Sequence, residues 1–169
     1  MSITLMALLA VAAAVFVGIN IGGSSTGVAF GPSVGSKLLS KTGAAGLMAV
    51  FALIGGWTVG RNVIATMGGK IVPSSEFTMM ASVIILFFIG LSLLISNLSG
   101  VPASTSMTAV GAIAGLGVAT GTINWSVMGR IMSWWLVAPA VAFLAGGMIG
   151  RYLYTRLNNY FKINHSEGE

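Results

Sequence analysis

Two short runs of hydroxyl side chains interrupt an otherwise apolar sequence, each beside glycine or proline. They are Ser24-Ser25-Thr26 after two glycines, and Ser104-Thr105-Ser106 shortly after Pro102. Ser and Thr at a helix start leave backbone N–H groups free at its positive end, which is an anion site. Transporters with broken helices hold anionic substrates in this way, so the runs predict an anion-binding site. From these residues alone, helix capping or bonding back to helix carbonyls explains the hydroxyls equally well.

Acidic and nucleophilic groups are nearly absent. The chain has no Asp and no Cys, and Glu76 is the one carboxylate before the C-terminal segment. We expect Glu76 to lie at the membrane interface, because it stands at the edge of an apolar run. His165 lies in a polar tail, away from any membrane-buried serine. Hydrolytic dyads, aspartate-rich Mg²⁺ sites and other metal sites lack their residues, so we predict a protein that is not an enzyme.

The elements that carry these runs are predicted to be membrane helices. Of the 169 residues 56% are hydrophobic and 7% charged, against about 25% charged in a soluble domain. A helix of about 20 apolar residues crosses the hydrocarbon core of a bilayer. We therefore predict an all-α, polytopic transmembrane helix bundle of about five spans, over 3–20, 43–60, 77–98, 101–120 and 127–150.

The segment 22–36 differs from these spans because it is rich in glycine and contains Pro32. Broken backbone at membrane depth is tolerated inside protein or beside a water-filled cavity. We therefore predict a re-entrant hairpin or a discontinuous helix there. Glycine pairs four residues apart further predict close helix packing; they are Gly27, Gly31 and Gly35, Gly56 and Gly60, Gly111 and Gly115, and Gly146 and Gly150.

The cations set the predicted topology. With five spans, one side of the membrane carries five cations and the other three. The positive-inside rule then places the N-terminus outside and the C-terminus in the cytoplasm. If 101–120 re-enters instead of crossing, the split reverses, so charge alone leaves both topologies open. We predict a membrane domain over 1–157 and a polar cytoplasmic tail over 158–169. Cations confined to the ends of apolar runs also argue against nucleic-acid binding.

Three segments resemble the inorganic phosphate transporter (PiT) family. Gly22 to Ser36, GGSSTGVAFGPSVGS, is similar without a gap to the family signature GANDVANAFGTSVGS, and the similarity continues through Gly43 to Ile71. Pro102 to Ala112, PASTSMTAVGA, resembles the family's PVSTTHALVGA, and Asn124-Trp125 matches a common VNW. The resemblance covers about 100 of the 169 residues in the same order.

The resemblance implies an elevator-like carrier of two inverted repeats, of which this chain holds one. Repeats of opposite orientation need an odd number of spans, which favours five. The family's anion-associated hydroxyls are kept at Ser104, Thr105 and in part Ser106. Its Asn-Asp pair, similar to sodium ligands, falls on Ser24 and Ser25. Three further family positions, an Asn, a Glu and a His, are occupied here by Val28, Ala52 and Met107.

Together these features predict half of a secondary, ion-coupled carrier that moves inorganic phosphate across the cell membrane. The expected substrate site is Ser24, Ser25, Thr26, Ser104, Thr105 and Ser106. We expect no bound cofactor, but a coupling cation, Na⁺ or H⁺, beside Asn20, Ser24 and Ser25. A second homologous half is the expected partner: another copy in opposite orientation, a separate protein or a fused half.

Two alternatives stay open. The first is a sulfate permease of the same family, because Asn20-Ile21-Gly22 and the small residues after it resemble that branch. Phosphate at neutral pH also carries a proton that an acceptor carboxylate would recognise, and this chain supplies none there. The second alternative is a membrane subunit that does not transport, because the family's Asn-Asp, Glu and His positions are changed.

Overall fold

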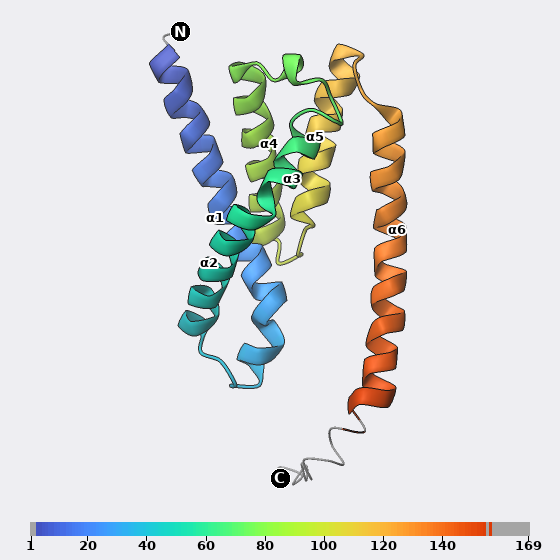
Figure 1. Ribbon diagram of the computed structural model, residues 1–169. Helices are drawn as coiled ribbons and strands as arrows, with labels where there is room; N and C mark the ends of the chain where they lie inside the picture. Colours follow the sequence, from blue (N-terminus) through green and yellow to red (C-terminus); the bar gives the residue numbers. More distant parts are fainter. Residues whose placement is uncertain (1–2, 155, 157–169) are drawn as a thin grey trace. The chain divides into compact units, whose positions relative to one another are not determined.

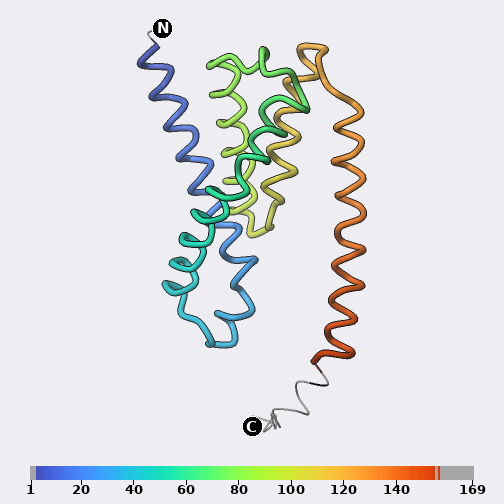
Figure 2. The backbone as a smooth tube through the Cα atoms, viewed as in Figure 1, coloured from blue at the N-terminus to red at the C-terminus, as the bar shows by residue number. Residues whose placement is uncertain are grey.

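The computed structural model describes residues 3–154 and 156, and all regular structure in these residues is helical. Figures 1 and 2 trace the helices in chain order from blue to red. The chain divides into two units, Met1–Trp125 and Ser126–Glu169. The predicted all-α class is confirmed. The polar tail predicted over 158–169 lies outside the described residues.

Helix α1, Ile3–Gly35, runs unbroken for 33 residues. At about 1.5 Å per residue it is about 50 Å long, well beyond the roughly 30 Å hydrocarbon core of a bilayer. The break predicted over 22–36 is therefore wrong. The Ser24 hydroxyl donates to the carbonyl oxygens of Asn20 and Ile21 at 3.2 and 3.3 Å, so the helix itself satisfies it. Without water to compete for them, the glycine N–H groups keep their helical partners.

The first helix ends in a tight turn. Pro32 lies in the last turn of α1, where its missing N–H removes one backbone hydrogen bond close to the end. Lys37 then takes a left-handed conformation, with φ 60°. Ser40 caps the next helix, α2 (Lys41–Thr58), because its hydroxyl oxygen accepts from the Gly43 N–H at 3.1 Å.

The helix break in this sequence lies after α2. Helix α2 and the short helix α3, Gly60–Met67, meet at Val59 with a bend of 65°. The span predicted over 43–60 is thus helical, but the sequence analysis did not foresee α3. The Asn62 N–H donates to the Val59 carbonyl at 3.1 Å and starts the new helical direction.

Helices α4 and α5 complete the first unit. A single 3₁₀ turn, η1 (Ser74–Glu76), leads into α4 (Met79–Leu98), and α5 (Thr105–Thr120) returns beside it. Thr78 caps α4 with its hydroxyl oxygen, and Gly121, at φ 70°, ends α5 in a left-handed turn. Helix α1 packs on α4, and α4 packs on α5 (Figure 1).

The core of this unit lies where α1 crosses α4. Val17 of α1 packs with Ile89 and Leu93 of α4, and Leu93 has no exposed surface. The close approach depends on Gly90, because a Cβ atom at that position would collide with the Phe16 ring. The tightest packing between these helices therefore rests on one glycine and one aromatic ring.

The glycine pairs predicted to pack helices together do not do so within this chain. In the residues described here, a Cβ added at eight of the nine would meet nothing within 4 Å. Gly60 approaches only the Gly55 carbonyl oxygen, at 4.0 Å. The prediction is wrong because residue spacing marks a small helix face but does not say which neighbour covers it. The eight are Gly27, Gly31, Gly35, Gly56, Gly111, Gly115, Gly146 and Gly150.

The second unit is mainly one long helix. Helix α6, Trp125–Met148, continues as a π-helix, η2 (Ile149–Tyr154), to give 30 helical residues. Its position matches the span predicted over 127–150. Pro139 lies within it, and the Arg151 guanidinium stands 5.8 Å from the centre of the Tyr152 ring.

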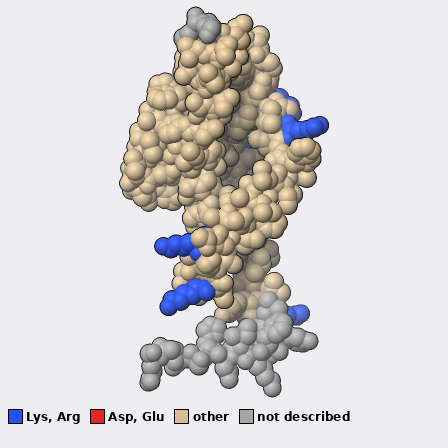
Figure 3. All heavy atoms as spheres, turned by 90° about the vertical axis from the view of Figure 1, so that its left-hand side faces the viewer, with Lys and Arg blue, Asp and Glu red and all other residues tan. Residues whose placement is uncertain are grey.

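All five predicted spans coincide with helices, but fewer reach membrane length. Three described helices are long and apolar enough to cross a bilayer, or four if the bent pair α2–α3 is one span. Helix α5 has 16 residues and falls short of that length. Large apolar side chains are exposed, among them Trp57 at 86% and Phe143 at 80%. Figure 3 shows a few isolated cations on an otherwise uncharged face. Such a surface suits lipid, so the chain is a multi-pass membrane protein.

Candidate functional site

The middle of α1 carries a polar group that the core encloses. Asn20 is 5% exposed, and its amide nitrogen donates to the Phe16 carbonyl at 2.8 Å. One helical turn on, Ser24 donates back to the Asn20 carbonyl. Because this stretch is continuous helix, its backbone N–H groups are already used. The first hydroxyl run therefore cannot offer the free N–H groups on which its predicted anion role depended.

The second hydroxyl run does start a helix. Ser104 has an extended conformation and accepts the Met107 N–H at 3.3 Å, so it is the N-cap of α5. The N–H groups of Thr105 and Ser106 lie in the first turn, where a helix supplies no partner for them. Pro102 lies two residues before the cap, outside the helix. These groups form a donor end at the positive pole of α5.

Asn97, at the end of α4, connects these two regions. Its amide nitrogen lies 3.1 Å from the Asn20 carbonyl oxygen and 3.4 Å from the Asn20 side-chain oxygen. Both partners are acceptors, so the nitrogen faces Asn20 and the oxygen of Asn97 faces away from it. The sequence analysis missed Asn97. An amide in a strongly apolar span was the available signal, because polar groups in membrane helices are costly and commonly functional.

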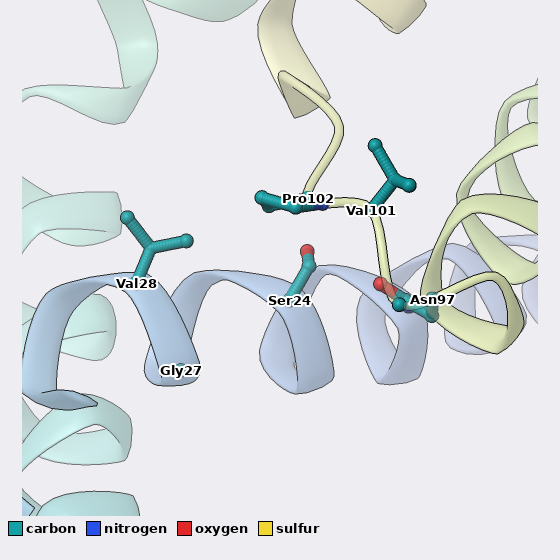
Figure 4. A pocket seen from close by; sticks show the side chains of 7 residues that line it. Ser24, Gly27, Val28, Asn97, Val101 and Pro102 are labelled. Atoms are coloured by element: carbon teal, nitrogen blue, oxygen red, sulfur yellow. The ribbon is translucent and has the colours of Figure 1, made fainter. Parts of the chain in front are cut away.

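A pocket of about 340 Å³ lies beside this amide pair. Figure 4 shows the Ser24 oxygen pointing from α1 toward the segment that carries Val101 and Pro102. The pocket brings the two family-like motifs, 22–36 and 102–112, to one place. It is lined by Ser24, Gly27, Val28, Asn97, Gly100, Val101 and Pro102.

The predicted site residues are only partly brought together. Ser24 lines the pocket, whereas Thr26 lines a second cavity of about 360 Å³ between α1 and α2, with Lys41 among its walls. Ser104 and Ser106 are exposed at the start of α5, and Thr105 is half-buried. The predicted single cluster of six hydroxyls is therefore divided: Ser24 lines the pocket, Thr26 the second cavity, and three lie at the α5 N-terminus. Ser25, half-buried on α1, lines neither cavity.

The site is electrically neutral. No charged side chain lines the pocket. Glu76 lies before the first turn of α4 and Asn97 in its last turn, which over 20 residues separates them by about 30 Å. No group of three or more His, Cys, Asp or Glu that could hold a metal ion occurs among the residues that the structure describes.

Comparison with known proteins identifies relatives of this chain. Residues 21–165 match the sequence profile of the phosphate transporter family, which is most of the chain. The chain belongs to the phosphate transporter family. This confirms the resemblance stated from the two motifs.

Individual relatives carry different substrate names. The sulfate permease CysP of Bacillus subtilis is 35% identical over 159 residues, covering 94% of this chain and 44% of that protein. A Helicobacter pylori protein named "Putative phosphate permease" is 35% identical over 76% of this chain and 26% of its own length. A sodium-dependent phosphate transporter of Toxoplasma gondii is 30% identical over 76% of this chain and 16% of its own length. No solved structure matches the chain.

This phosphate transporter family chain spans less than half the length of these relatives. The aligned part includes both motifs that meet at the pocket, which are separated in sequence by the whole of α2, α3 and α4. All the residues that line the pocket therefore lie within the part of the chain that matches the family profile.

Proposed function

We propose that this chain is one half of a secondary carrier that moves inorganic phosphate across the cell membrane. The observation that carries the proposal is the N-terminus of α5, where Ser104, Thr105 and Ser106 present hydroxyl and backbone donors at the positive helix pole. A tetrahedral oxyanion accepts hydrogen bonds on every oxygen, so such an end can replace part of its water shell. The family profile and the phosphate-named relatives support phosphate as the substrate.

Sulfate is the second candidate. It is favoured by the sulfate permease relative, which covers nearly the whole of this chain. The neutral pocket also lacks a carboxylate that would accept the proton of phosphate. Both anions bind the same kind of donor end, so the proposed mechanism is the same for either.

Two further parts of the proposal concern partners. A coupling cation, Na⁺ or H⁺, would lie near Asn20, Ser24 and Ser25, with support from the sodium-dependent relative. A second half would complete the carrier, since the chain spans 44% and 26% of two relatives' lengths. Open glycine faces such as Gly27–Gly31 offer that half a close approach.

Labelled-anion uptake tests the carrier function. The chain, purified from native membranes through a tag together with any bound partner, is reconstituted into proteoliposomes. We expect uptake of labelled phosphate, reduced by excess unlabelled phosphate. Uptake of sulfate in preference would assign the alternative substrate. Entry of neither anion above protein-free vesicles would contradict transport and favour a subunit that does not transport.

Orientation is tested by labelling single cysteines in this Cys-free chain. A cysteine at Ser2 should react with an impermeant reagent from outside intact cells, whereas one at Ser166 should react after permeabilisation. The expectation follows from the cation split and an odd number of spans. The reverse pattern would contradict the orientation, and outside labelling of both ends would contradict the odd number of spans.

A further inference from the structure

The second cavity, between α1 and α2, combines apolar walls with a positive charge. This α1–α2 cavity has a volume of about 360 Å³ and lies between residues 26–35 of α1 and the first turn of α2. Phe30 and Val34 of α1 and Ala44 of α2 form its apolar walls. Lys41 is the charged residue that lines it. The carrier function proposed above gives this lysine no role.

The cavity exists because α2 separates from α1 beyond one buried residue. Ala44 is 2% exposed, whereas the other residues of α2, all of them described, are half-buried or exposed. Opposite α2, Gly27, Gly31 and Gly35 of α1 are exposed, and a Cβ added at any of them would meet nothing within 4 Å. The cavity therefore opens outward. In a bilayer, lipid or protein fills such an opening, because an unfilled apolar space loses packing contacts.

Lys41 sets the depth of the cavity in the membrane. A charged side chain is costly inside the hydrocarbon, so Lys41 and the exposed Lys37 of the preceding turn mark the membrane interface. From Gly35 to Thr26 the cavity follows α1 for about 14 Å, at 1.5 Å rise per residue. One end of the cavity therefore lies at the level of the lipid headgroups and the other among the acyl chains.

The charge of these lysines has no acidic neighbour in the described part of the chain. Glu76 is the one carboxylate among the described residues, and it precedes the first turn of α4. Helix α4 runs parallel to the first half of α1 and ends where Asn97 meets Asn20 (Figure 1). Glu76 is therefore more than about 30 Å from the cavity, and the headgroup end of the cavity attracts anions.

We infer that the α1–α2 cavity binds an anionic phospholipid, with its phosphate at Lys41 and an acyl chain against Phe30 and Val34. Basic pockets between membrane helices bind anionic headgroups, and the cytoplasmic leaflet carries anionic lipids. The orientation proposed above places this cavity in that leaflet. The apolar walls favour a lipid over free phosphate, which would leave them facing water. The inference goes beyond the carrier function and does not require it.

A second half of the carrier is the competing occupant of this space. A lipid in the cavity would cover Gly27 and Gly31, which were offered above to that half. The open Gly111 and Gly115 of α5 would remain available to it. Lys41 favours the lipid, because an apolar helix face offers its ammonium group no negative charge.

The test is the thermal unfolding midpoint of the protein, purified in detergent with any bound partner and titrated with phospholipid. Phosphatidylglycerol is the anionic probe, and phosphatidylcholine with the same acyl chains is the zwitterionic comparison. We expect phosphatidylglycerol to raise the midpoint well above the rise with phosphatidylcholine. In Lys41→Gln, the phosphatidylglycerol concentration for half the effect should increase about 5-fold, the contribution of one lysine near anionic headgroups. Lys41→Arg keeps the charge and should titrate as wild type.

A second variant tests the apolar part of the cavity. Gly31→Leu places a side chain in the open space between the helices and should remove most of the difference between the two lipids. Leucine favours a helix more than glycine does, so this variant should fold. Gly46→Leu, at an equally open position of α2 outside the cavity, is its matched control. Lys70→Gln, which changes an exposed lysine outside the cavity, is the control for Lys41→Gln. Both controls should titrate as wild type.

Equal midpoint shifts with the two lipids would overturn the inference, as would wild-type titrations in both Lys41→Gln and Gly31→Leu. Loss of a co-purifying partner in Gly31→Leu, with an unchanged response to lipid, would assign the cavity to the second half instead.

Inorganic phosphate distinguishes this inference from the carrier proposal, which places the free anion at α5. If Lys41→Gln weakens the response to inorganic phosphate as much as the response to phosphatidylglycerol, the cavity holds the free anion and the lipid assignment is wrong. If inorganic phosphate has no effect while the lipid response depends on Lys41, the carrier proposal loses support and the lipid site stands.

Discussion

Replacing both Ser104 and Thr105 with alanine is expected to weaken phosphate binding by at least about 100-fold. Hydrogen bonds to a charged group contribute about 1.5–3 kcal/mol each, and about 1.4 kcal/mol corresponds to tenfold in affinity. The double variant removes two hydroxyls from the donor end of α5. The measurement is phosphate-dependent thermal stabilisation, followed by uptake in proteoliposomes.

The Ser104 hydroxyl also caps α5, so loss of the cap must be separated from loss of a ligand. Removing an N-cap costs about 0.5–2 kcal/mol of stability by itself. Thr78→Ala is the matched control, because Thr78 caps α4 in the same way, accepting the Ala81 N–H at 3.2 Å. It should lower stability without changing phosphate affinity.

Ser104→Asp separates the two effects in the opposite way, because it keeps the helix cap and removes only the anion ligand. Asp caps a helix as well as Ser does, but its charge repels an anion. We therefore expect a stable protein that does not respond to phosphate. If Ser104→Asp and the double alanine variant both respond to phosphate as wild type does, α5 is not the anion site and the carrier proposal loses its main support.

Gly117→Ala is expected to destabilise the protein by about 1–3 kcal/mol, the usual cost of overfilling a packed core. A Cβ at Gly117 would lie 2.7 Å from Cγ2 of Val72 and 2.9 Å from Cβ of Ile123. It would also lie 3.1 Å from the Ile123 Cα, so the backbone itself would have to move. The Val72 side chain has no exposed surface, so it has no open space into which it could move aside.

Gly115→Ala, on the same helix, is the matched control. A Cβ at Gly115 would meet nothing within 4 Å in the described chain, so we expect no loss of stability. Thermal unfolding of the two variants in detergent makes the comparison. Val72→Ala combined with Gly117→Ala should recover part of the loss, since it removes the nearest atom. Equal losses in Gly115→Ala and Gly117→Ala would show that this contact is not decisive.

Much of the fold was predictable because each helix that crosses a membrane needs a continuous run of apolar residues, which can be seen in the sequence. Each of the five apolar segments coincides with a helix, since a span must carry about 20 apolar residues in succession whatever its neighbours are. Helix capping was one of the explanations that the sequence allowed for Ser104, and the structure shows the cap, because the Met107 N–H bonds to its hydroxyl. The family followed from two contiguous motifs whose residues lie next to one another in the chain.

The continuity of α1 was not predictable from composition. Glycine and proline weaken helices in water, and on that basis 22–36 reads as a break. In the structure the helix continues to Gly35, with the Ser24 hydroxyl bonded inside it, whereas the bend occurs at Val59, directly before Gly60. Helix breaks depend on which backbone groups find partners, and that is a property of the surroundings.

The sequence by itself determined the membrane class, the positions of the apolar helices and the family. The tertiary structure alone decided which polar groups meet. Asn20 and Asn97 are 77 residues apart, and their hydrogen bond exists because α4 crosses α1 at Gly90. It also decided the directions of the hydroxyls, so that Ser24 offers an oxygen and α5 offers N–H groups. The spacing of residues along the chain shows only which residues are near neighbours within one helix. Which polar side chains pair, and in which direction they point, depends on the packing of helices that are distant in sequence.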